Sequence, residues 1–421
     1  MKPSYIVISL FLLVANIYGT KGQTAAYHDT LSSFLVISDM HLHANTKLKE
    51  AHSDSDDSLW MLARKETISV IQEKKPRFLI VLGDLPFHAD CNDTNSIKEA
   101  RKSFDTVLNH LTGVAKETGI PVIILPGNND SWNGDYRKFF LPDSIFDIVK
   151  YPLLDYPKID SGNKASLINA THLKDGYYSV YPNGKQYGLR LVCMSTSMFA
   201  KDNYCSYDGN EDSDANTQLD WLTKELRNAK DSGEPVLIAM HIPPGIDGFK
   251  SGDDTAYMWY SHLRQNRFLD LIHDYQDNIV GLLSSHTHMD GIRLLRNNDR
   301  DSIASLLLSE PAIAPGHGNN PAIKLVEYDP NNFALKNFVT YYMNYWNSNT
   351  APTLKDWDSS FIFSKIAPGY DLSSMDMLEY FRKSCDKNCL DEIIDSIYTV
   401  KSKDPKAYIE TKSEYVDYEN N

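Results

Sequence analysis

The chain has 421 residues, of which 42% are hydrophobic and 11% aromatic. A chain of this length and composition can bury a large core, which excludes a disordered or fibrous protein and favours one large domain with an appendage. Its formal net charge of −14 repels nucleic acid and anionic membrane surfaces at long range. We therefore expect neither of these as the main partner, and no nucleic-acid polymer as a substrate.

The first 22 residues have the pattern of a secretory signal peptide. Lys2 precedes the apolar stretch 6–15, and the small residues Gly19 and Gly22 follow it. We expect the mature chain to begin near Gln23 and the protein to be secreted or exported to a lysosomal or periplasmic compartment. The alternative, a membrane anchor, needs about 20 apolar residues, which this run does not reach. No later segment is apolar enough to span a bilayer.

Five apolar runs along the chain, each typical of a buried strand, end on side chains that bind metal ions. A single histidine after a strand is more often a hydrogen-bonded structural residue, but five such strand ends together indicate a metal centre. In open α/β sheets, ligands bind beyond the carboxyl ends of the strands, so we expect the side chains to converge. The runs cover residues 34–37, 78–82, 122–125, 236–240 and 279–283, and they are followed by Asp39 and His41, Asp84, Asn128, His241, and His286 and His288.

Apolar stripes at helical spacing predict four helices between these runs. They cover residues 60–71, 97–114, 218–226 and 258–275. For the second helix we expect Ser96 as the N-cap and Gly119 as the end. The opening 130 residues therefore alternate strand, helix, strand, helix, strand, which is the layout of a parallel sheet.

The later part of the chain is rich in short strands. Asn183 and Gly184 predict the turn of a hairpin between residues 177–181 and 187–192. Strands expected at 292–295, 304–308, 323–328 and 335–341 suggest a second, largely antiparallel sheet packed on the first. From residue 345 the pattern changes to aromatic-rich loop and charged helix, clearest at 377–398. We therefore predict a catalytic domain over residues 23–344 and a C-terminal helical subdomain over 345–421.

The five cysteines suggest some disulfide use in an exported chain, and their odd number leaves at least one unpaired or intermolecular. Cys385 and Cys389 lie four positions apart and could close a small loop. Cys193 with Cys205 is the next candidate pair, which would leave Cys91 over.

Three asparagines begin glycosylation acceptor sequences. Asn92 and Asn169 are candidate glycan sites. Asn129 lies inside the proposed metal centre, so we expect no glycan there.

The types of ligand indicate the metal and the reaction. Carboxylate oxygen, amide oxygen and imidazole nitrogen together suit Zn, Mn or Fe, whereas a Mg or Ca site is nearly all oxygen. Seven ligands are too many for one tetrahedral ion but suit two ions that share a carboxylate, and ions paired at about 3.5 to 4 Å catalyse phosphoryl transfer. We expect a metal-bridging hydroxide to attack phosphorus in line. Two divalent ions also supply the local positive charge that an anionic substrate needs.

These motifs resemble those of the calcineurin-like metallophosphoesterases, over roughly residues 34 to 330. The residues that carry the resemblance are Asp39-Met40-His41, Gly83-Asp84, Gly127-Asn128-Asn129-Asp130, His241 and Ser285-His286-Thr287-His288. Residues 83–88, residues 241–245, Asn320-Pro321 and the pair Cys385 and Cys389 are similar to the acid sphingomyelinase branch of that family. The resemblance implies an α/β fold of two packed mixed β-sheets flanked by helices, and zinc as the metal.

The resemblance also implies a role for each residue of the centre. The first metal would be held by Asp39, His41, Asp84 and His288, and the second by Asp84, Asn128, His241 and His286, so that Asp84 bridges the two. His88 stands where the branch places the proton donor for the leaving group.

Three departures from the family pattern bear on the activity. Asn129 occupies a position where the family usually has histidine, and an amide cannot donate a titratable proton. Either His88 carries the acid role alone or the enzyme is slow, since loss of one acid or base group costs ~10² to 10⁴ in rate. Ser285 replaces a glycine, a small change. Only about ten residues separate Gln23 from the first strand, so we expect no saposin-like lipid-presenting domain.

We accordingly predict an exported dinuclear-metal phosphodiesterase that hydrolyses phosphodiester or phosphoanhydride bonds of soluble nucleotides or phosphocholine esters. The alternative is a sphingomyelin phosphodiesterase that releases ceramide and phosphocholine, with a phospholipid as its partner. A second alternative is a catalytically weak, metal-stabilised binding protein, in which Asn129 marks the loss of activity.

Overall fold

The computed structural model describes residues 31–44, 54–139, 165–200, 211–246, 258–259, 262–296, 303–345, 353, 357, 359–366, 372–373, 400 and 415–416. The chain divides into two compact units, Met1–Leu31 and Ser32–Asn421, and every element below belongs to the second. The expected signal peptide (1–22), the expected helix 377–398, Cys385 and Cys389 lie outside the described residues. The division into domains at residue 345 stays a prediction.

The described strands form two mixed sheets. They are β1 (Ser32–Ile37), β2 (Leu79–Val81), β3 (Val122–Ile124), β4 (Ser166–Asn169), β5 (Tyr178–Tyr181), β6 (Arg190–Cys193), β7 (Val236–Ala239), β8 (Ile279–Ser284), β9 (Gly291–Arg296), β10 (Ile303–Ser309), β11 (Ala322–Tyr328), β12 (Leu335–Tyr342), β13 (Ser359–Ile362) and β14 (Tyr415–Val416). The six-stranded sheet has the order β13-β12-β11-β1-β2-β3, and the eight-stranded sheet β14-β9-β10-β8-β7-β6-β5-β4. The predicted α/β class with two mixed sheets is confirmed.

The late strands do not form a sheet of their own, so that expectation is wrong. β11 pairs antiparallel with β1 and extends the first sheet, whereas β10 pairs parallel with β8 and extends the second. The five ligand-bearing strands are divided as well: β1, β2 and β3 lie in one sheet, and β7 and β8 in the other. An apolar run shows that both faces of a strand are covered but does not show which neighbour it pairs with.

The helices lie close to their predicted positions. They are α1 (Asp57–Lys74), α2 (Thr94–Thr118), α4 (Glu211–Ser232), α5 (His262–Asp274) and the short α6 (Phe363–Ile366). Gly119 ends α2 in the left-handed conformation, as predicted. The N-cap of α2 is Asp93 and not Ser96, because the Asp93 carboxylate accepts from the Asn95 N–H while the Ser96 hydroxyl accepts from the Asp90 N–H. The helix expected from residue 258 begins at His262.

The expected hairpin is formed by β5 and β6, which pair antiparallel. Its connection is longer than a two-residue turn, because a 3-10 helix, Lys185–Tyr187, follows Gly184.

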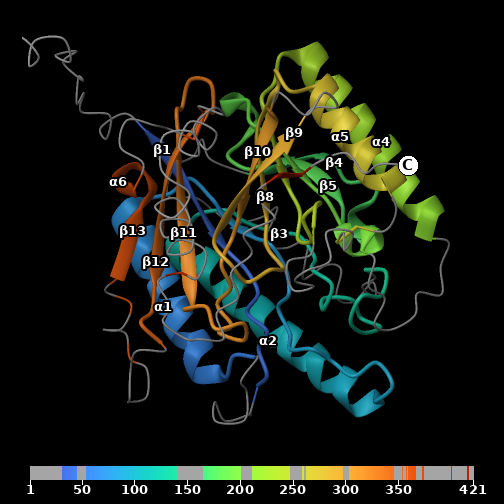
Figure 1. The fold of residues 1–421 in the computed structure, drawn as a ribbon. Coiled ribbons are helices and arrows are strands. Elements are labelled where there is room, and N and C mark those ends of the chain that lie inside the picture. Colours follow the sequence, from blue (N-terminus) through green and yellow to red (C-terminus); the bar gives the residue numbers. More distant parts are fainter. Residues whose placement is uncertain are drawn as a thin grey trace, which may run out of the picture. The chain divides into compact units, whose positions relative to one another are not determined.

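Buried side chains form three layers of core. Figure 1 shows the ribbons of α1 and α2 on one side of the sheets and those of α4 and α5 on the other. One cluster fills the space between the sheets, a second lies between the six-stranded sheet and helices α1 and α2, and a third lies between the eight-stranded sheet and helices α4 and α5. The order of layers is therefore helix, sheet, sheet, helix. Both sheets are held rigidly by apolar contacts, and the loops at their carboxyl ends start from fixed points.

The prediction that Cys193 pairs with Cys205 and leaves Cys91 over is wrong, whereas the prediction of an unpaired cysteine is confirmed. Cys193 is a free thiol, fully buried on β6, and burial raises its pKa to about 12. Cys91, which we expected to be left over, is disulfide-bonded. Sequence spacing does not show that Cys193 faces the core between the sheets, where no second cysteine of the described residues lies.

The packing between the sheets predicts the effect of truncating Leu237, a fully buried residue on β7. Leu237→Ala should lower the free energy of unfolding by about 2 to 5 kcal/mol, because it removes apolar contacts and leaves a cavity. Urea denaturation measures the change. Tyr187→Ser, at an exposed position, should stay within about 0.5 kcal/mol of the wild type. Equal stability of the two variants would contradict this packing.

Candidate metal centre

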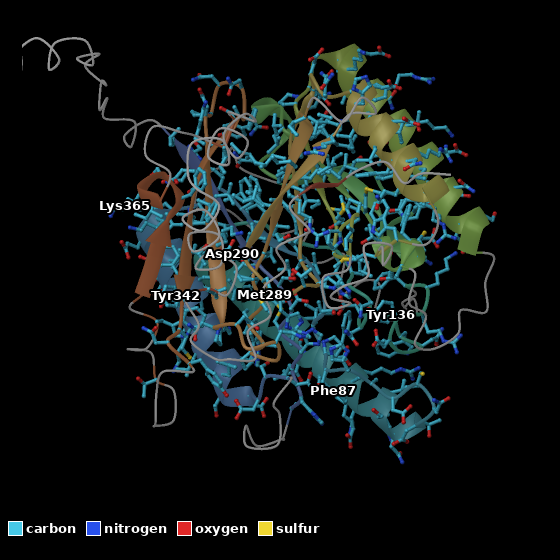
Figure 2. The ribbon with its side chains drawn as sticks, in the orientation of Figure 1. Phe87, Tyr136, Met289, Asp290, Tyr342 and Lys365 are labelled. Atoms are coloured by element: carbon cyan, nitrogen blue, oxygen red, sulfur yellow. The ribbon has the colours of Figure 1, made fainter. Side chains whose placement is uncertain are left out.

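The structure brings all seven predicted ligands to the carboxyl ends of five strands. Asp39 and His41 follow β1, Asp84 follows β2, Asn128 follows β3, His241 follows β7, and His286 and His288 follow β8. All are buried except His286, which is partly buried. Because β7 and β8 belong to the second sheet, the site lies where the carboxyl ends of the two sheets meet. Figure 2 labels Phe87, Tyr136 and Met289 in the lower half of the view. These three residues are the sequence neighbours of His88, Asp135 and His288.

Five of these residues have a backbone conformation that side chains other than glycine rarely adopt. Such a conformation costs of order 1 to 3 kcal/mol per residue and persists only where the surrounding structure enforces it. Residues of this kind cluster at functional sites. The positive φ angles are 49° at Asp39, 39° at His41, 54° at Asp84, 72° at His286 and 64° at His288.

The first group of ligand atoms comes from Asp39, His41 and His288. The Nε2 atoms of His41 and His288 lie 3.1 Å apart, and they lie 3.6 and 3.5 Å from Asp39 Oδ1. Asp84 Oδ2 lies 3.5 Å from His41 Nε2. Zinc bonds of about 2.0 to 2.2 Å put neighbouring tetrahedral ligands about 3.3 to 3.6 Å apart. The spacing of these four atoms therefore fits one cation among them.

The second group comes from Asp84, His241 and His286. His241 Nδ1 donates to the Leu82 carbonyl at 2.7 Å, which leaves Nε2 as the acceptor, 3.1 Å from Asp84 Oδ2. Burial disfavours a charged His241, but the carboxylates of Asp84 and Asp39 outweigh burial and raise its pKa to about 9. The position attracts a proton or a metal cation.

Asn128 is the remaining predicted ligand of this second group. Its Nδ2 donates to Asp135 Oδ1 at 2.8 Å, and its Oδ1 is buried without a hydrogen-bond partner. Asp39 Oδ1 and His241 Nε2 are also buried without a hydrogen bond. Buried acceptors of this kind are costly unless a cation satisfies them, so the chain's own residues fit a pair of metal ions.

The two carboxylates carry the charge that the cations need. Burial opposes ionisation of Asp39 and Asp84, but the facing His241 outweighs it and holds the pKa of both groups below the ordinary value. Both therefore stay ionised.

His88 lies at the open side of the centre. Its ring stacks on that of His41 with centroids 4.5 Å apart, and its Nδ1 lies 3.4 Å from Asp135 Oδ2. Burial disfavours the charged imidazole, but Asp135 outweighs it and raises the pKa of His88 to about 9. The side chain is 47% exposed, so a bound molecule can reach it.

Asn129 is 5% exposed and is turned toward Asp84. Its backbone N–H donates to Asp84 Oδ1 at 2.9 Å and its Nδ2 donates to Asp84 Oδ2 at 2.8 Å. The backbone N–H and the side-chain amide of Asn129 therefore both position that carboxylate.

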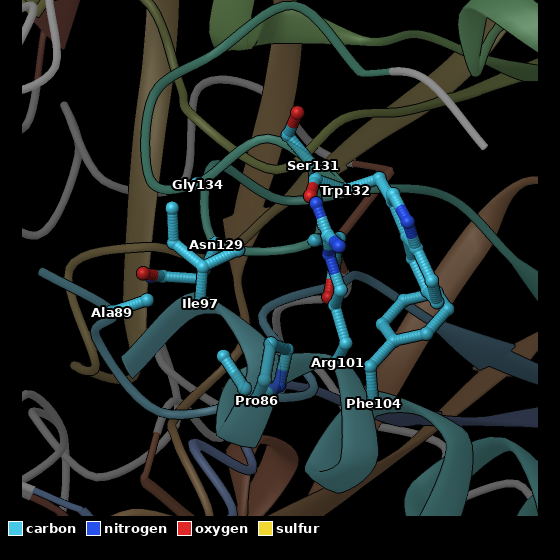
Figure 3. A pocket seen from close by; sticks show the side chains of 11 residues that line it. Pro86, Ala89, Ile97, Arg101, Phe104, Asn129, Ser131, Trp132 and Gly134 are labelled. Atoms are coloured by element: carbon cyan, nitrogen blue, oxygen red, sulfur yellow. Dashed lines mark hydrogen bonds between the residues drawn. The ribbon is translucent and has the colours of Figure 1, made fainter. Parts of the chain in front are cut away.

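A small pocket lies beside Asn129 (Figure 3). Figure 3 shows Arg101 beside Trp132 in its lining. The guanidinium carbon of Arg101 lies 4.9 Å from the centroid of the Trp132 ring. The pocket holds about 10 Å³, which is room for one water molecule. It is too small to hold an organic group of a substrate.

Several residues of the site were not among the predicted ones. The carboxylate of Asp130 accepts from the backbone N–H groups of Asp84, Leu85 and Gly127 at 2.7 to 2.8 Å, which ties two ligand loops together. The Ser285 hydroxyl donates to Asp39 Oδ2 and leaves Oδ1 to face the imidazoles. Both residues lie inside the motifs quoted above, but sequence spacing does not reveal whom they contact.

Others come from segments that carried no sequence signal. Asp54, in an acid-rich loop, lies near His41 and His88 in a third grouping of ligand-type atoms. Tyr136 OH lies 3.3 Å from His286 Nε2, and the ring of His317 lies edge-on to that of His288 with centroids 4.5 Å apart. These contacts are made only by folding, because the partners lie far apart in sequence.

Comparison with known proteins places this architecture in a class. The model of the calcineurin-like phosphoesterase family matches residues 32–290, and the chain belongs to that family. It is a metal-dependent phosphoesterase, and its Asp and His clusters are consistent with two metal ions.

Among the relatives, cyclic GMP-AMP phosphodiesterase SMPDL3A of Homo sapiens is 27% identical over 290 residues, which are 65% of this chain and 57% of that protein. Acid sphingomyelinase-like phosphodiesterase 3b of Mus musculus is 26% identical over 340 residues, 76% of this chain and 68% of that protein. The chain thus matches little more than half of the human relative's length. A dimetal phosphatase from Danio rerio aligns with a TM-score of 0.46 at 14% identity, over 74% of this chain and 96% of that one.

The close approach of two loops predicts the effect of a substitution at Gly127. A Cβ added there would lie 2.1 Å from Asp84 Oδ1, so the carboxylate would have to move. Gly127→Ala should weaken metal binding by at least about 10-fold, the lower end of what displacing a ligand's support costs. Competition with a chelator measures the affinity. Gly188→Ala is the control, because its φ is 78° but an added Cβ meets nothing within 4 Å. Wild-type affinity in Gly127→Ala would contradict the geometry.

Proposed function

We propose that the protein is a phosphodiesterase that hydrolyses phosphodiester or phosphoanhydride bonds of soluble nucleotides or phosphocholine esters with two divalent ions, zinc being the best match. The observation that supports it most strongly is the convergence of ligand-type side chains from five strand ends, with buried acceptor atoms of Asp39, Asn128 and His241 left without a hydrogen-bond partner. The names of the relatives support the diester specificity, since they are described as phosphodiesterases of cyclic GMP-AMP and as sphingomyelinase-like.

In this proposal each predicted ligand keeps its place. Asp84 would be shared between the two ions, Asp39, His41 and His288 would hold the first, and Asn128, His241 and His286 would hold the second. When bound, the ions supply the Lewis acidity that polarises a phosphoryl group and activates water. Asn129 would keep Asp84 in place toward the ions, because it donates to both oxygens of that carboxylate.

His88 is the proposed proton donor to the leaving group. It is the exposed imidazole of the site, and its Nδ1 faces Asp135, so Nε2 is left for the substrate. Asn129 does not compete for this role, since an amide has no titratable proton to transfer.

Sphingomyelin is the second candidate substrate, supported by the match to sphingomyelinase phosphodiesterase C of Dictyostelium discoideum, 24% identical over 77% of this chain and 71% of that protein. A metal-stabilised binding protein is the third.

None of the helices in the described part of the chain is both long and apolar enough to cross a membrane.

We also propose that the protein is exported. The disulfide at Cys91 supports an oxidising compartment. Asn92 is exposed and suits a glycan. Asn169 suits one less well, because its side-chain amide nitrogen already donates to Glu225 at 2.8 Å.

Hydrolysis of bis-p-nitrophenyl phosphate tests the function. The purified protein should turn over this diester, lose activity with a chelator, and recover it with Zn²⁺ or Mn²⁺. Loss of a residue that only supports a metal ligand weakens metal binding by about 10- to 100-fold. Asp84→Asn should weaken it by more than this, because it removes the carboxylate shared by both ions. Asp231→Asn, exposed on α4, is the control. Absence of chelator-sensitive turnover would favour the binding protein, and preference for the monoester would favour a phosphatase.

Replacement of His88 tests the proton donor. His88→Ala should slow substrates with poor leaving groups by about 10² to 10⁴ and slow nitrophenyl esters far less, because nitrophenolate departs without a proton. Turnover of a nucleotide diester and of the nitrophenyl diester measures the ratio. His172→Ala is the control, since His172 makes a similar contact to Asp175 at 3.1 Å. Equal losses on both substrates would exclude His88 as the acid.

A further inference from the structure

Asp135 lies between a metal ligand and the proposed proton donor. It is 6% exposed, and it sits in the loop that follows Asn128, where the Tyr136 N–H donates to the Asn128 carbonyl at 2.9 Å. Its two carboxylate oxygens face different partners: Oδ1 faces Asn128 and Oδ2 faces His88. A buried carboxylate with a separate partner on each oxygen holds both in fixed positions.

The contact with Asn128 decides which end of that amide faces the metal. The Nδ2 of Asn128 donates to Asp135 Oδ1 at 2.8 Å, and only a nitrogen can donate to a carboxylate. The Oδ1 of Asn128 must therefore point the other way, where it is buried without a hydrogen-bond partner. A rotated amide would turn N–H groups toward the cation and bind nothing. Asp135 thus selects the orientation of Asn128 that binds metal.

The contact with His88 decides which ring nitrogen faces the substrate. Nδ1 lies 3.4 Å from Asp135 Oδ2, a long hydrogen bond, and the ring is held on its other face by stacking on His41. Nε2 is left on the exposed side. A histidine free to rotate about its side-chain bonds would present either nitrogen and would lose the fixed geometry that proton transfer requires.

We propose that Asp135 is a positioning residue that couples the second metal site to the proton donor: one carboxylate sets the orientation of Asn128 and of His88 together. The part of the proposal that concerns His88 rests on the proposed function, whereas the part that concerns Asn128 does not. It predicts that one substitution disturbs metal binding and leaving-group expulsion, two properties that substitution of His88 or Asn128 would affect separately.

Two variants separate the contacts. Asp135→Ala removes both acceptors, so it should weaken binding of one of the two ions by about 10- to 100-fold and slow poor-leaving-group substrates as much as His88→Ala does. Asp135→Asn keeps one acceptor, which can still receive the Asn128 amide, but its N–H₂ cannot accept from His88. It should therefore retain both ions and lose only the leaving-group effect. When either Asp135 variant is combined with His88→Ala, the second substitution should cause no further loss of rate on substrates with poor leaving groups.

The measurements are titration of the metal-stripped full-length protein with Zn²⁺ against a competing chelator, and turnover of a nucleotide diester relative to the nitrophenyl diester. Asp175→Ala is the matched control, because it breaks an equivalent Asp–His contact outside the site. Unchanged Zn²⁺ affinity in Asp135→Ala, or losses that are equal on both substrates and additive with His88→Ala, would overturn the proposal. If the wild type hydrolyses no diester, the proposed function fails, while the Zn²⁺ titration still decides the role toward Asn128.

Discussion

The structure of the site depends on one constraint: metal-ligand atoms, some of them without a hydrogen-bond donor, are buried face to face. His41 Nε2 and His288 Nε2 lie 3.1 Å apart, and Asp39 Oδ1 has no hydrogen-bond donor from the protein. Water is excluded from these atoms, so only protons or cations can balance them. Divalent ions do so with the ligand spacing already present. The fold therefore specifies a cation site before any substrate is considered.

Holding these atoms together requires a rigid frame around them. The ligand loops adopt left-handed conformations at five positions, and each is fixed by a contact from another part of the chain. Asp130 accepts three backbone N–H groups from two loops, the Leu82 carbonyl fixes His241, and the Ser285 hydroxyl fixes Asp39. The sheets beneath are locked by apolar packing. Strain at the ligands is thus opposed by a shell of hydrogen bonds, as is usual for metal sites.

The sequence predicted the ligands because each follows an apolar run, and runs of this kind are local features. Asp84 after 78–82 and His241 after 236–240 needed no knowledge of the fold. The division of the strands between two sheets, the free thiol of Cys193 and the disulfide at Cys91 could not be predicted, because each depends on which segments become neighbours. The same holds for Asp135, which lies in a stretch without periodicity and acts only through Asn128 and His88. Roles that depend on a partner's position in space leave no trace in spacing.

The position of Asn129 links these two levels. Where the resemblance places histidine, this chain has Asn129. Its backbone N–H donates to one oxygen of the Asp84 carboxylate, and its side-chain Nδ2 donates to the other. An amide there adds a positioning contact to Asp84 and supplies no titratable proton. In the proposed mechanism proton transfer then falls to His88, whose Nδ1 faces Asp135. Because Asp135 also orients Asn128, the proposed acid and the proposed second metal are held by the same loop. This chain has no histidine at position 129, and in the proposed site the other acid group, His88, is held in place relative to the metal ligands by Asp135.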